Sequence, residues 1–140
     1  MIFKPMTTLQ ELEWIRERTH VVPTIDSMGL VAYQDETIVA MCLADTFTVD
    51  SCSVHLGIDN PLVLRHGFLE ELADWLFVQC GRKRLFGLVP DNNEKALKMN
   101  LHIGWREVTR IPDVLCEGVG TVVMRMDKED CRWLKKREAA

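Results

Sequence analysis

Three short segments of this chain carry side chains that could do chemistry, and the first is centred on His55. This histidine lies in residues 52–58, CSVHLGI, an apolar run that predicts a strand. An imidazole titrates near neutral pH and can take a proton from a substrate ammonium, so His55 is a candidate general base. Alternation along the strand turns His55 to one face of the sheet, and Val54 and Leu56 to the other. A strand histidine that only bonds a polar neighbour or faces solvent is the alternative.

The second segment, LRHGFL at residues 64–69, precedes a stretch with the apolar spacing of a helix. Backbone N–H groups at the start of a helix favour an anion, and a glycine such as Gly67 lets the anion approach the chain closely. The segment is therefore a candidate anion site. Arg65 is its better side-chain ligand. We expect His66 to be an exposed loop residue, with a contact to the anion as the alternative.

The third segment, residues 84–105, reads as a buried strand, a polar cap and a short helix. Pro90 stops the strand, Asn93 caps a helix that begins at Glu94, and Gly104 ends that helix. An aromatic residue, Trp105, follows directly. The segment therefore predicts a β-α unit whose capping amide lies at the end of a strand.

Other reactive residues are weaker candidates. The four histidines and five cysteines show no local pairing with the spacing of metal ligands, so no metal site is expected. Cys52 could accept an acyl group as a nucleophile, but a buried strand cysteine commonly behaves as a small hydrophobe. Acidic residues of the loops and strand ends either attract a cationic amine or are simply solvated: Asp26, Asp45, Asp50 and Asp59.

The elements that must position these segments follow the order β, α, β, β, β, α, β, α, β, β. Hairpins in the first half and β-α-β units in the second predict a mixed α/β sheet. The first helix has a capping box, because Glu11 stands in the reciprocal position to a threonine. The expected strands cover residues 1–6, 29–34, 37–45, 52–58, 85–89, 106–111 and 120–126, and the expected helices begin at Thr7 or Thr8, at Gly67 and at Glu94.

Length and composition fit one globular domain over residues 1–140, with a charged tail from about residue 127. The net charge of −4 argues against a nucleic-acid partner. Five cysteines without a CxxC pair indicate reduced thiols and a cytoplasmic location. No apolar stretch is long enough for a signal peptide or a membrane span, so no membrane partner is expected. In the tail, Trp133 either packs back onto the sheet or belongs to a homodimer contact.

The order of elements and two of the segments resemble the GCN5-related N-acetyltransferases, the GNAT superfamily. Residues 64–69 resemble the family's phosphate-binding pattern Gln/Arg-x-x-Gly-x-Gly/Ala, with Leu69 at a position that is usually small. Residues 93–105, NEKALKMNLHIGW, resemble its Asn-x-x-Ala…Gly-Phe segment. The resemblance implies a mixed, mostly antiparallel sheet that is splayed between its fourth and fifth strands and flanked by helices.

The resemblance also implies an acyl-CoA-dependent N-acyltransferase, with acetyl-CoA as co-substrate and a primary amine as acceptor. In such an enzyme the backbone N–H near Leu56 polarises the thioester carbonyl, Asn93 lies beside the pantetheine arm, and His55 deprotonates the amine. Asn100 stands where the family often has a tyrosine as general acid, and an amide donates a hydrogen bond but no proton at neutral pH. The residues whose amides would hold the pyrophosphate are Arg65, His66, Gly67, Phe68 and Leu69.

A narrower resemblance points to small GNAT-like proteins of tailed bacteriophages and prophages. It rests on the runs VHLGIDNPLVLRHGFLEE and VMRMDKEDCRWL. Some of those relatives are virion-associated, so the resemblance implies an alternative function. The chain would then be a GNAT-shaped binding or structural protein without turnover, found in the virion. A nucleic-acid-directed acetyltransferase toxin would need a basic face, which the acidic composition disfavours.

Overall fold

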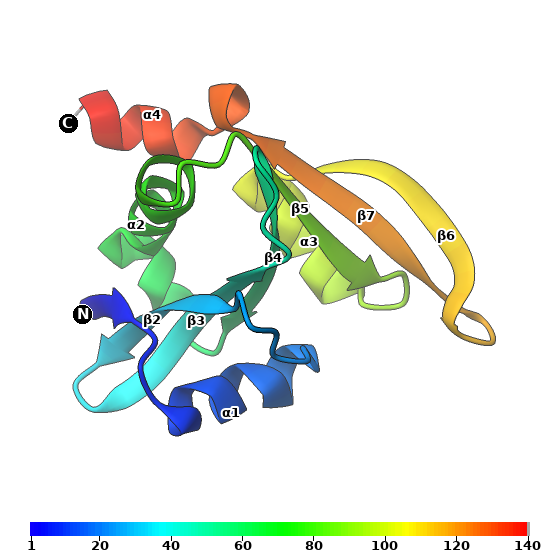
Figure 1. Ribbon diagram of the computed structural model, residues 1–140, viewed down its shortest axis with the longest axis horizontal. Coiled ribbons are helices and arrows are strands. Elements are labelled where there is room, and N and C mark those ends of the chain that lie inside the picture. Colours follow the sequence, from blue (N-terminus) through cyan, green and yellow to red (C-terminus); the bar gives the residue numbers. More distant parts are fainter. Residues whose placement is uncertain (140) are drawn as a thin grey trace.

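The computed structural model describes residues 1–139 as a seven-stranded sheet with helices on both faces (Figure 1). The strands lie in the order β1-β2-β3-β4-β5-β7-β6. They are β1 (Ile2–Pro5), β2 (Met28–Gln34), β3 (Thr37–Asp45), β4 (Ser51–Ile58), β5 (Arg84–Pro90), β6 (Arg106–Cys116) and β7 (Val119–Asp127). The helices are α1 (Leu9–Thr19), α2 (Phe68–Asp74), α3 (Glu94–Ile103) and α4 (Arg132–Ala139), with 3₁₀ turns at Pro61–His66 and Lys128–Asp130 and a π-helical turn at Trp75–Gln79.

β4 and β5 are the only parallel neighbours in this sheet of residues 1–139, and they pair over part of their length. Their register covers residues 51–53 of β4 and 84–86 of β5. Because β4 continues to Ile58 and β5 to Pro90, the two strands separate toward their C-terminal ends. This confirms the predicted fold class, a mostly antiparallel sheet splayed between the fourth and fifth strands and flanked by helices.

The two faces of the sheet carry different helices (Figure 1). α1 packs on one face, where its Ile15 joins a core with Met41 of β3. α2 and α4 cover the other face with a larger core that includes Phe68 and Leu134. α3 lies over β5 and β7, against Met124. β4 therefore runs between two cores, which hold its side chains in fixed positions.

The predicted capping box at the start of α1 is confirmed, and its glutamate also reaches the sheet. The Thr8 hydroxyl accepts the Glu11 N–H at 3.1 Å, and one Glu11 oxygen accepts the N–H groups of Thr7 and Thr8 at 2.8 and 3.0 Å. The Tyr33 hydroxyl donates to the other oxygen at 2.6 Å. Burial alone raises the pKa of the Glu11 carboxyl, but the hydrogen bonds from Tyr33, Thr7 and Thr8 outweigh it and bring the pKa below 4.5.

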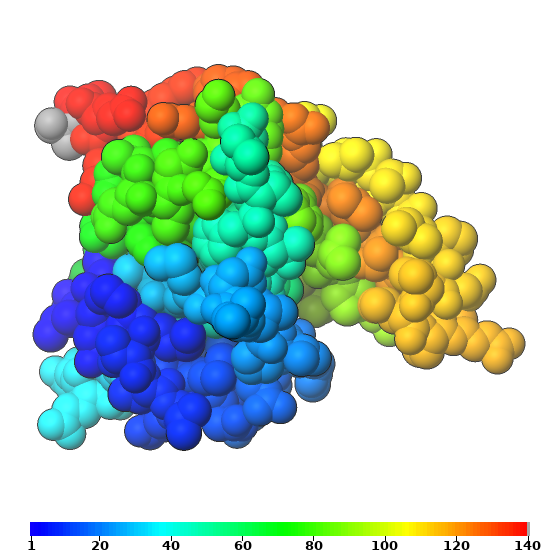
Figure 2. All heavy atoms as spheres, in the orientation of Figure 1, coloured from blue at the N-terminus to red at the C-terminus, as the bar shows by residue number. Residues whose placement is uncertain are grey.

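The last hairpin is longer than the sequence predicts. Pro112 is expected to separate two strands, yet β6 runs through it to Cys116. β6 is the edge of the sheet, where the missing N–H of a proline leaves no hydrogen bond of the ladder unmade. The β6–β7 hairpin projects from the body of the protein (Figure 2).

The charged tail, for which the sequence predicts no element, folds as α4. Leu134 is buried in the core beneath α2, and the Trp133 indole N–H donates to the Ile103 carbonyl at 2.7 Å. Lys136 pairs with Glu70 of α2 at 3.0 Å. Of the two alternatives for Trp133, the structure has the side chain packed against the protein's own core. In the described part of the chain, no helix is long and apolar enough to cross a membrane.

Candidate functional site

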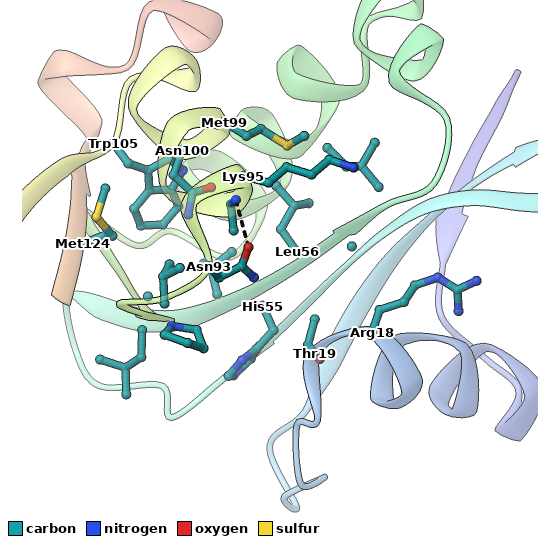
Figure 3. Close-up of a pocket in the computed structure, with 18 of the residues that line it drawn as sticks. Arg18, Thr19, His55, Leu56, Asn93, Lys95, Met99, Asn100, Trp105 and Met124 are labelled. Atoms are coloured by element: carbon teal, nitrogen blue, oxygen red, sulfur yellow. Dashed lines mark hydrogen bonds between the residues drawn. The ribbon is translucent and has the colours of Figure 1, made fainter. Parts of the chain in front are cut away.

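The separation of β4 and β5 opens a cleft of about 710 Å³. Residues 54–58 of β4 form one wall, and residues 87–90 of β5 form the other. α3 borders the cleft from one face of the sheet, and the C-terminal end of α1 borders it from the opposite face (Figure 3). Of the predicted site residues, the cleft brings together His55, Leu56, Asn93 and Asn100.

The backbone N–H of Leu56 points into this cleft. On the β3 side, the Asp59 N–H donates to the Val39 carbonyl at 2.9 Å. Amide directions alternate along a strand, so the N–H groups of Gly57 and His55 also point to β3, while that of Leu56 points toward β5. The pairing with β5 has already ended at this position. The Leu56 N–H can therefore donate to the carbonyl oxygen of a bound ligand.

Gly87 lets β5 lie close to β4 at the inner end of the cleft. A Cβ at this position would lie 3.3 Å from the carbonyl oxygen of Val54, which is tighter than nine in ten such contacts. The Val54 carbonyl points to β5, as the alternation along the strand requires for a residue two before Leu56. A larger residue at position 87 would push the two strands apart where the cleft begins.

His55 is held by a buried carboxylate. Its Nε2 lies 3.1 and 3.2 Å from the two carboxylate oxygens of Asp45. His55 pairs with Leu43 across the β3–β4 register, so Asp45, two residues further along β3, lies on the same face. Asp45 is 5% exposed, and the His55 side chain is 27% exposed. Because an ionised carboxylate only accepts, Nε2 carries the hydrogen and Nδ1 of the neutral ring keeps a lone pair.

Thr46 braces Asp45 from a strained backbone conformation. Its φ is 51°, in the left-handed region that β-branched residues rarely adopt. From there its hydroxyl donates to Asp45 Oδ1 at 3.2 Å. The N–H of the next residue, Phe47, donates to the Asp26 carboxylate at 2.9 Å. Strain that the surrounding bonds hold in place is frequent at functional sites, and here it fixes the carboxylate that orients His55.

α3 presents two asparagine side chains to the cleft (Figure 3). Asn93 caps the helix as predicted: its Oδ1 accepts the Ala96 N–H at 3.2 Å, which leaves its two amide hydrogens for a ligand. Asn100 follows two turns later on the same side of the helix. Its backbone carbonyl accepts the N–H groups of Gly104 and Trp105 at 3.1 and 2.9 Å, which ends the helix at the predicted glycine.

An ion pair stands at the mouth of the cleft beside α1. Arg18 donates to both oxygens of Asp59, at 2.8 and 2.7 Å, and its guanidinium lies 3.7 Å from the ring centroid of Trp14. The hydrogen bonds between them raise the pKa of Arg18 and lower that of Asp59. Both charges are therefore engaged within the protein. His20 ends α1 in a left-handed conformation and borders the same mouth.

The predicted anion segment does not line this cleft. Arg65 and His66 are exposed, as expected for His66. The side chains of Phe68 and Leu69 are buried in the core, and the Phe68 ring lies 5.8 Å from the ring of Phe3 in the edge strand β1. Leu69 also lines a small apolar pocket with Val54 and Leu56 of β4, so the start of α2 packs over β4 with its side chains directed into the core.

The start of α2 still offers backbone N–H donors, and two carboxylates lie in the same turn. Gly67 has a φ of 84°, and its N–H is used by the Val63 carbonyl. The next N–H groups lack helical acceptors, as at the start of any helix. Glu70 and Glu71 stand in the same turn. Lys136 and Arg137 of α4 pair with these two carboxylates. The pyrophosphate role of residues 65–69 stays a prediction.

The remaining reactive groups show no catalytic arrangement. Burial raises the pKa of the Cys52 thiol to about 12, so it is protonated and inert at neutral pH. Within residues 1–139, no three His, Cys, Asp or Glu side chains gather as the ligands of a metal ion would.

Sequence reasoning missed the partner of His55. Asp45 was one of four acidic residues without a specific role. The strand register could have identified this partner. When β3 and β4 are paired so that their apolar residues are buried, the carboxylate at the end of β3 lies beside the β4 histidine. The Arg18–Asp59 pair joins residues 41 positions apart and has no local signal.

Neither a family model nor a curated protein matches the chain by sequence. Its fold, in contrast, is similar to those of solved acetyltransferases. A Desulfovibrio desulfuricans protein assigned to the acetyltransferases of the GNAT family has a TM-score of 0.72 and 10% identity over 91% of this chain and 98% of its own. N-acetyltransferase PseH of Campylobacter jejuni, solved in complex with acetyl coenzyme A, has a TM-score of 0.64 and 16% identity over 91% of this chain and 99% of its own.

A mutant of spermidine N-acetyltransferase SpeG from Vibrio cholerae has a TM-score of 0.63 and 15% identity over 92% of this chain and 78% of its own. At these identities the likeness establishes the fold. The chain has the GNAT fold that the sequence resemblance predicted. The narrower resemblance to phage proteins stays a prediction.

Proposed function

We propose that this protein is an acyl-CoA-dependent N-acyltransferase that transfers an acetyl group from acetyl-CoA to a primary amine by direct attack. One observation carries the proposal. A backbone N–H without a strand partner, that of Leu56, and a histidine oriented by a buried carboxylate, His55, occupy adjacent positions of the strand that borders the cleft. Acyl transfer to an amine needs these two functions, a donor for the developing oxyanion and an acceptor for the amine proton.

The cleft suits the acyl end and the pantetheine arm of the co-substrate. Its walls are the two strands, whose separated edges offer backbone groups to an extended, amide-containing chain. Asn93 adds two side-chain donors at the start of α3, and Trp105 and Met124 add apolar lining. The phosphate end fits less closely, because residues 64–69 lie outside the lining of the cleft and the Gly67 N–H is used by the Val63 carbonyl. Arg65 and the N–H groups of Phe68 and Leu69, which lack helical acceptors, are the proposed contacts there.

Three residues that line the cleft, and the carboxylate that holds His55, have distinct proposed roles. The Leu56 N–H donates to the thioester oxygen and strengthens its bond as charge develops, a one-donor oxyanion hole. His55 accepts a proton from the amine, and Asp45 orients the ring and stabilises the imidazolium that forms. Asn100 donates a hydrogen bond near the thioester without supplying a proton.

The charges of the lining narrow the acceptor class. Among the described residues that line the cleft, the one carboxylate is Asp59, and it is bonded to Arg18. Lys95 adds a positive charge to the same lining. A polyamine would carry several positive charges into this environment, so a primary amine next to a neutral or anionic group is the better match. A small amine, a protein lysine and a protein N-terminus all remain within this class.

Turnover is the test of this function. We expect wild-type protein to release thiol from acetyl-CoA in the presence of an amino acid or peptide amine, faster than without amine and faster than with spermidine. Thiol appearance is followed with a disulfide reagent across an amine panel, and the acetylated product is confirmed by mass. Release that is independent of the amine would contradict acyl transfer.

A second candidate is a GNAT-fold binding or structural protein without turnover, which the sequence links to phage virions. The position of residues 64–69 outside the lining of the cleft, and the asparagine at position 100, favour it. The oriented His55 favours the enzyme, because it lines an open cleft beside the Leu56 N–H, where the pairing with β5 has ended. Binding of acetyl-CoA without any amine-dependent thiol release would support the second candidate.

A further inference from the structure

We propose that His55 carries the proton in both directions: it takes the proton from the attacking amine and returns it to the thiolate that leaves. This inference rests on the proposed function. A single imidazole then acts as both the general base and the general acid. No separate tyrosine acid is needed, which accounts for the asparagine at position 100.

The cleft offers few other proton donors. Arg18 and Asp59 are bonded to each other. The chain's one tyrosine, Tyr33, is absent from the lining and donates its hydroxyl to Glu11; burial and this bond raise its pKa to about 12. The titratable side chains among the described lining residues are Arg18, His20, His55, Asp59 and Lys95.

The environment of His55 suits a group that is protonated and deprotonated at the same atom. Asp45 engages Nε2 through both carboxylate oxygens, so Nδ1 is the nitrogen that gains and loses the proton. The carboxylate is buried and braced by Thr46, which keeps the ring in place while its charge changes. His20, the other histidine of the lining, is exposed, and its ring has no hydrogen-bond partner within residues 1–139.

One proton passes through His55 in the proposed reaction. The nitrogen of a neutral amine forms a bond to the acyl carbon and gives one proton to Nδ1 of His55, while the Leu56 N–H donates to the carbonyl oxygen. The carbon–sulfur bond then breaks, and its electron pair stays on sulfur. Nδ1 gives the same proton to that sulfur, so an amide, a thiol and a neutral His55 result. A thiol has a reference pKa of about 8.5, so its thiolate accepts a proton from an imidazolium.

The test compares two acetyl thioesters that differ in their need for protonation. Acetyl-CoA releases an alkyl thiolate, whereas S-acetyl p-nitrothiophenol releases a much less basic aryl thiolate. With an amine that wild type acetylates, we expect His55→Ala to lower kcat/KM by about 10³-fold for acetyl-CoA and by only about 10-fold for the aryl thioester. His102→Ala, at an exposed position of α3 outside the lining, is the matched control and should change neither value.

Equal losses for the two thioesters in His55→Ala would overturn the proposal. A loss that depends on the leaving group in His20→Ala, and not in His55→Ala, would overturn it in favour of the other histidine. Wild type that releases no thiol from acetyl-CoA with any amine would contradict the proposed function itself, a result distinct from equal losses in an active enzyme.

A double-mutant cycle provides a second measurement with acetyl-CoA alone. Asn100→Tyr introduces a phenol that can act as the acid. If His55 donates the proton, this change should raise kcat/KM of His55→Ala by about 10-fold and that of wild type by less than about 2-fold, because the two groups then share one task. An increase by the same factor in both backgrounds would show that His55 does not protonate the thiolate.

Discussion

Replacing Asp45 with asparagine is expected to lower kcat/KM for amine acetylation by about 10³-fold, the size of loss expected when the His55 base itself is removed. In the wild type the carboxylate accepts from Nε2 of His55 at 3.1 Å and leaves Nδ1 unprotonated. The carboxamide of Asp45→Asn can instead donate to Nε2, which favours the tautomer with a hydrogen on Nδ1. That tautomer has no lone pair at the nitrogen proposed to accept the amine proton.

The split between kcat and KM separates this positioning role from a merely structural one. The wrong tautomer removes the base but leaves the walls of the cleft in place, so the loss in Asp45→Asn should fall on kcat, with KM for acetyl-CoA changed by less than about 2-fold. Asp50→Asn is the matched control, because Asp50 is exposed and its carboxylate lies 3.9 Å from Lys83. An unchanged kcat in Asp45→Asn would remove Asp45 from the mechanism.

The second large effect concerns stability. Glu11→Ala is expected to lower the free energy of unfolding by about 3 kcal/mol at pH 7, since it leaves three donors without their charged acceptor. Those donors are the N–H groups of Thr7 and Thr8 and the hydroxyl of Tyr33. Glu13→Ala is the control: Glu13 is exposed and pairs only with Arg16 on the same helix, a contact worth about 0.5 kcal/mol at most.

The sign of the pH dependence follows from the carboxyl of Glu11. Its folded-state pKa lies below 4.5, so the stabilisation is fully present above pH 4.5 and is lost as the pH falls through the lower folded-state pKa. The difference between wild type and Glu11→Ala in urea denaturation should therefore shrink as the pH falls below 4.5. A difference that is as large at pH 3 as at pH 7 would contradict the assignment.

Local signals in the sequence were sufficient to predict most elements of the fold. The Thr8–Glu11 capping box and the Asn93–Gly104 boundaries each act within a few residues, and both are confirmed. The continuation of β6 through Pro112 was not foreseen, because whether a proline is tolerated depends on which strand lies at the edge of the sheet. α4 was missed because its apolar residues are few, and its stability comes from packing on α2.

The candidate site also combines residues that local sequence predicts with residues that only the three-dimensional structure brings in. His55, Leu56, Asn93 and Asn100 were predicted from one strand and one helix, and the structure brings them to a single cleft. The partner of His55 belongs to a different strand, so only the register of β3 and β4 reveals it. The position of residues 65–69 depends on the 3₁₀ turn before α2, whose direction the local sequence does not specify.

The most direct test of the central claim is whether the cleft binds acetyl-CoA. We expect saturating acetyl-CoA to raise the melting temperature of the wild-type protein, because a ligand that binds only the folded state at 100 times its Kd stabilises it by about 2.7 kcal/mol. ATP at the same concentration, with an adenine nucleotide but no acyl-pantetheine arm, should give a much smaller shift. No shift with millimolar acetyl-CoA, or an equal shift with ATP, would contradict the account.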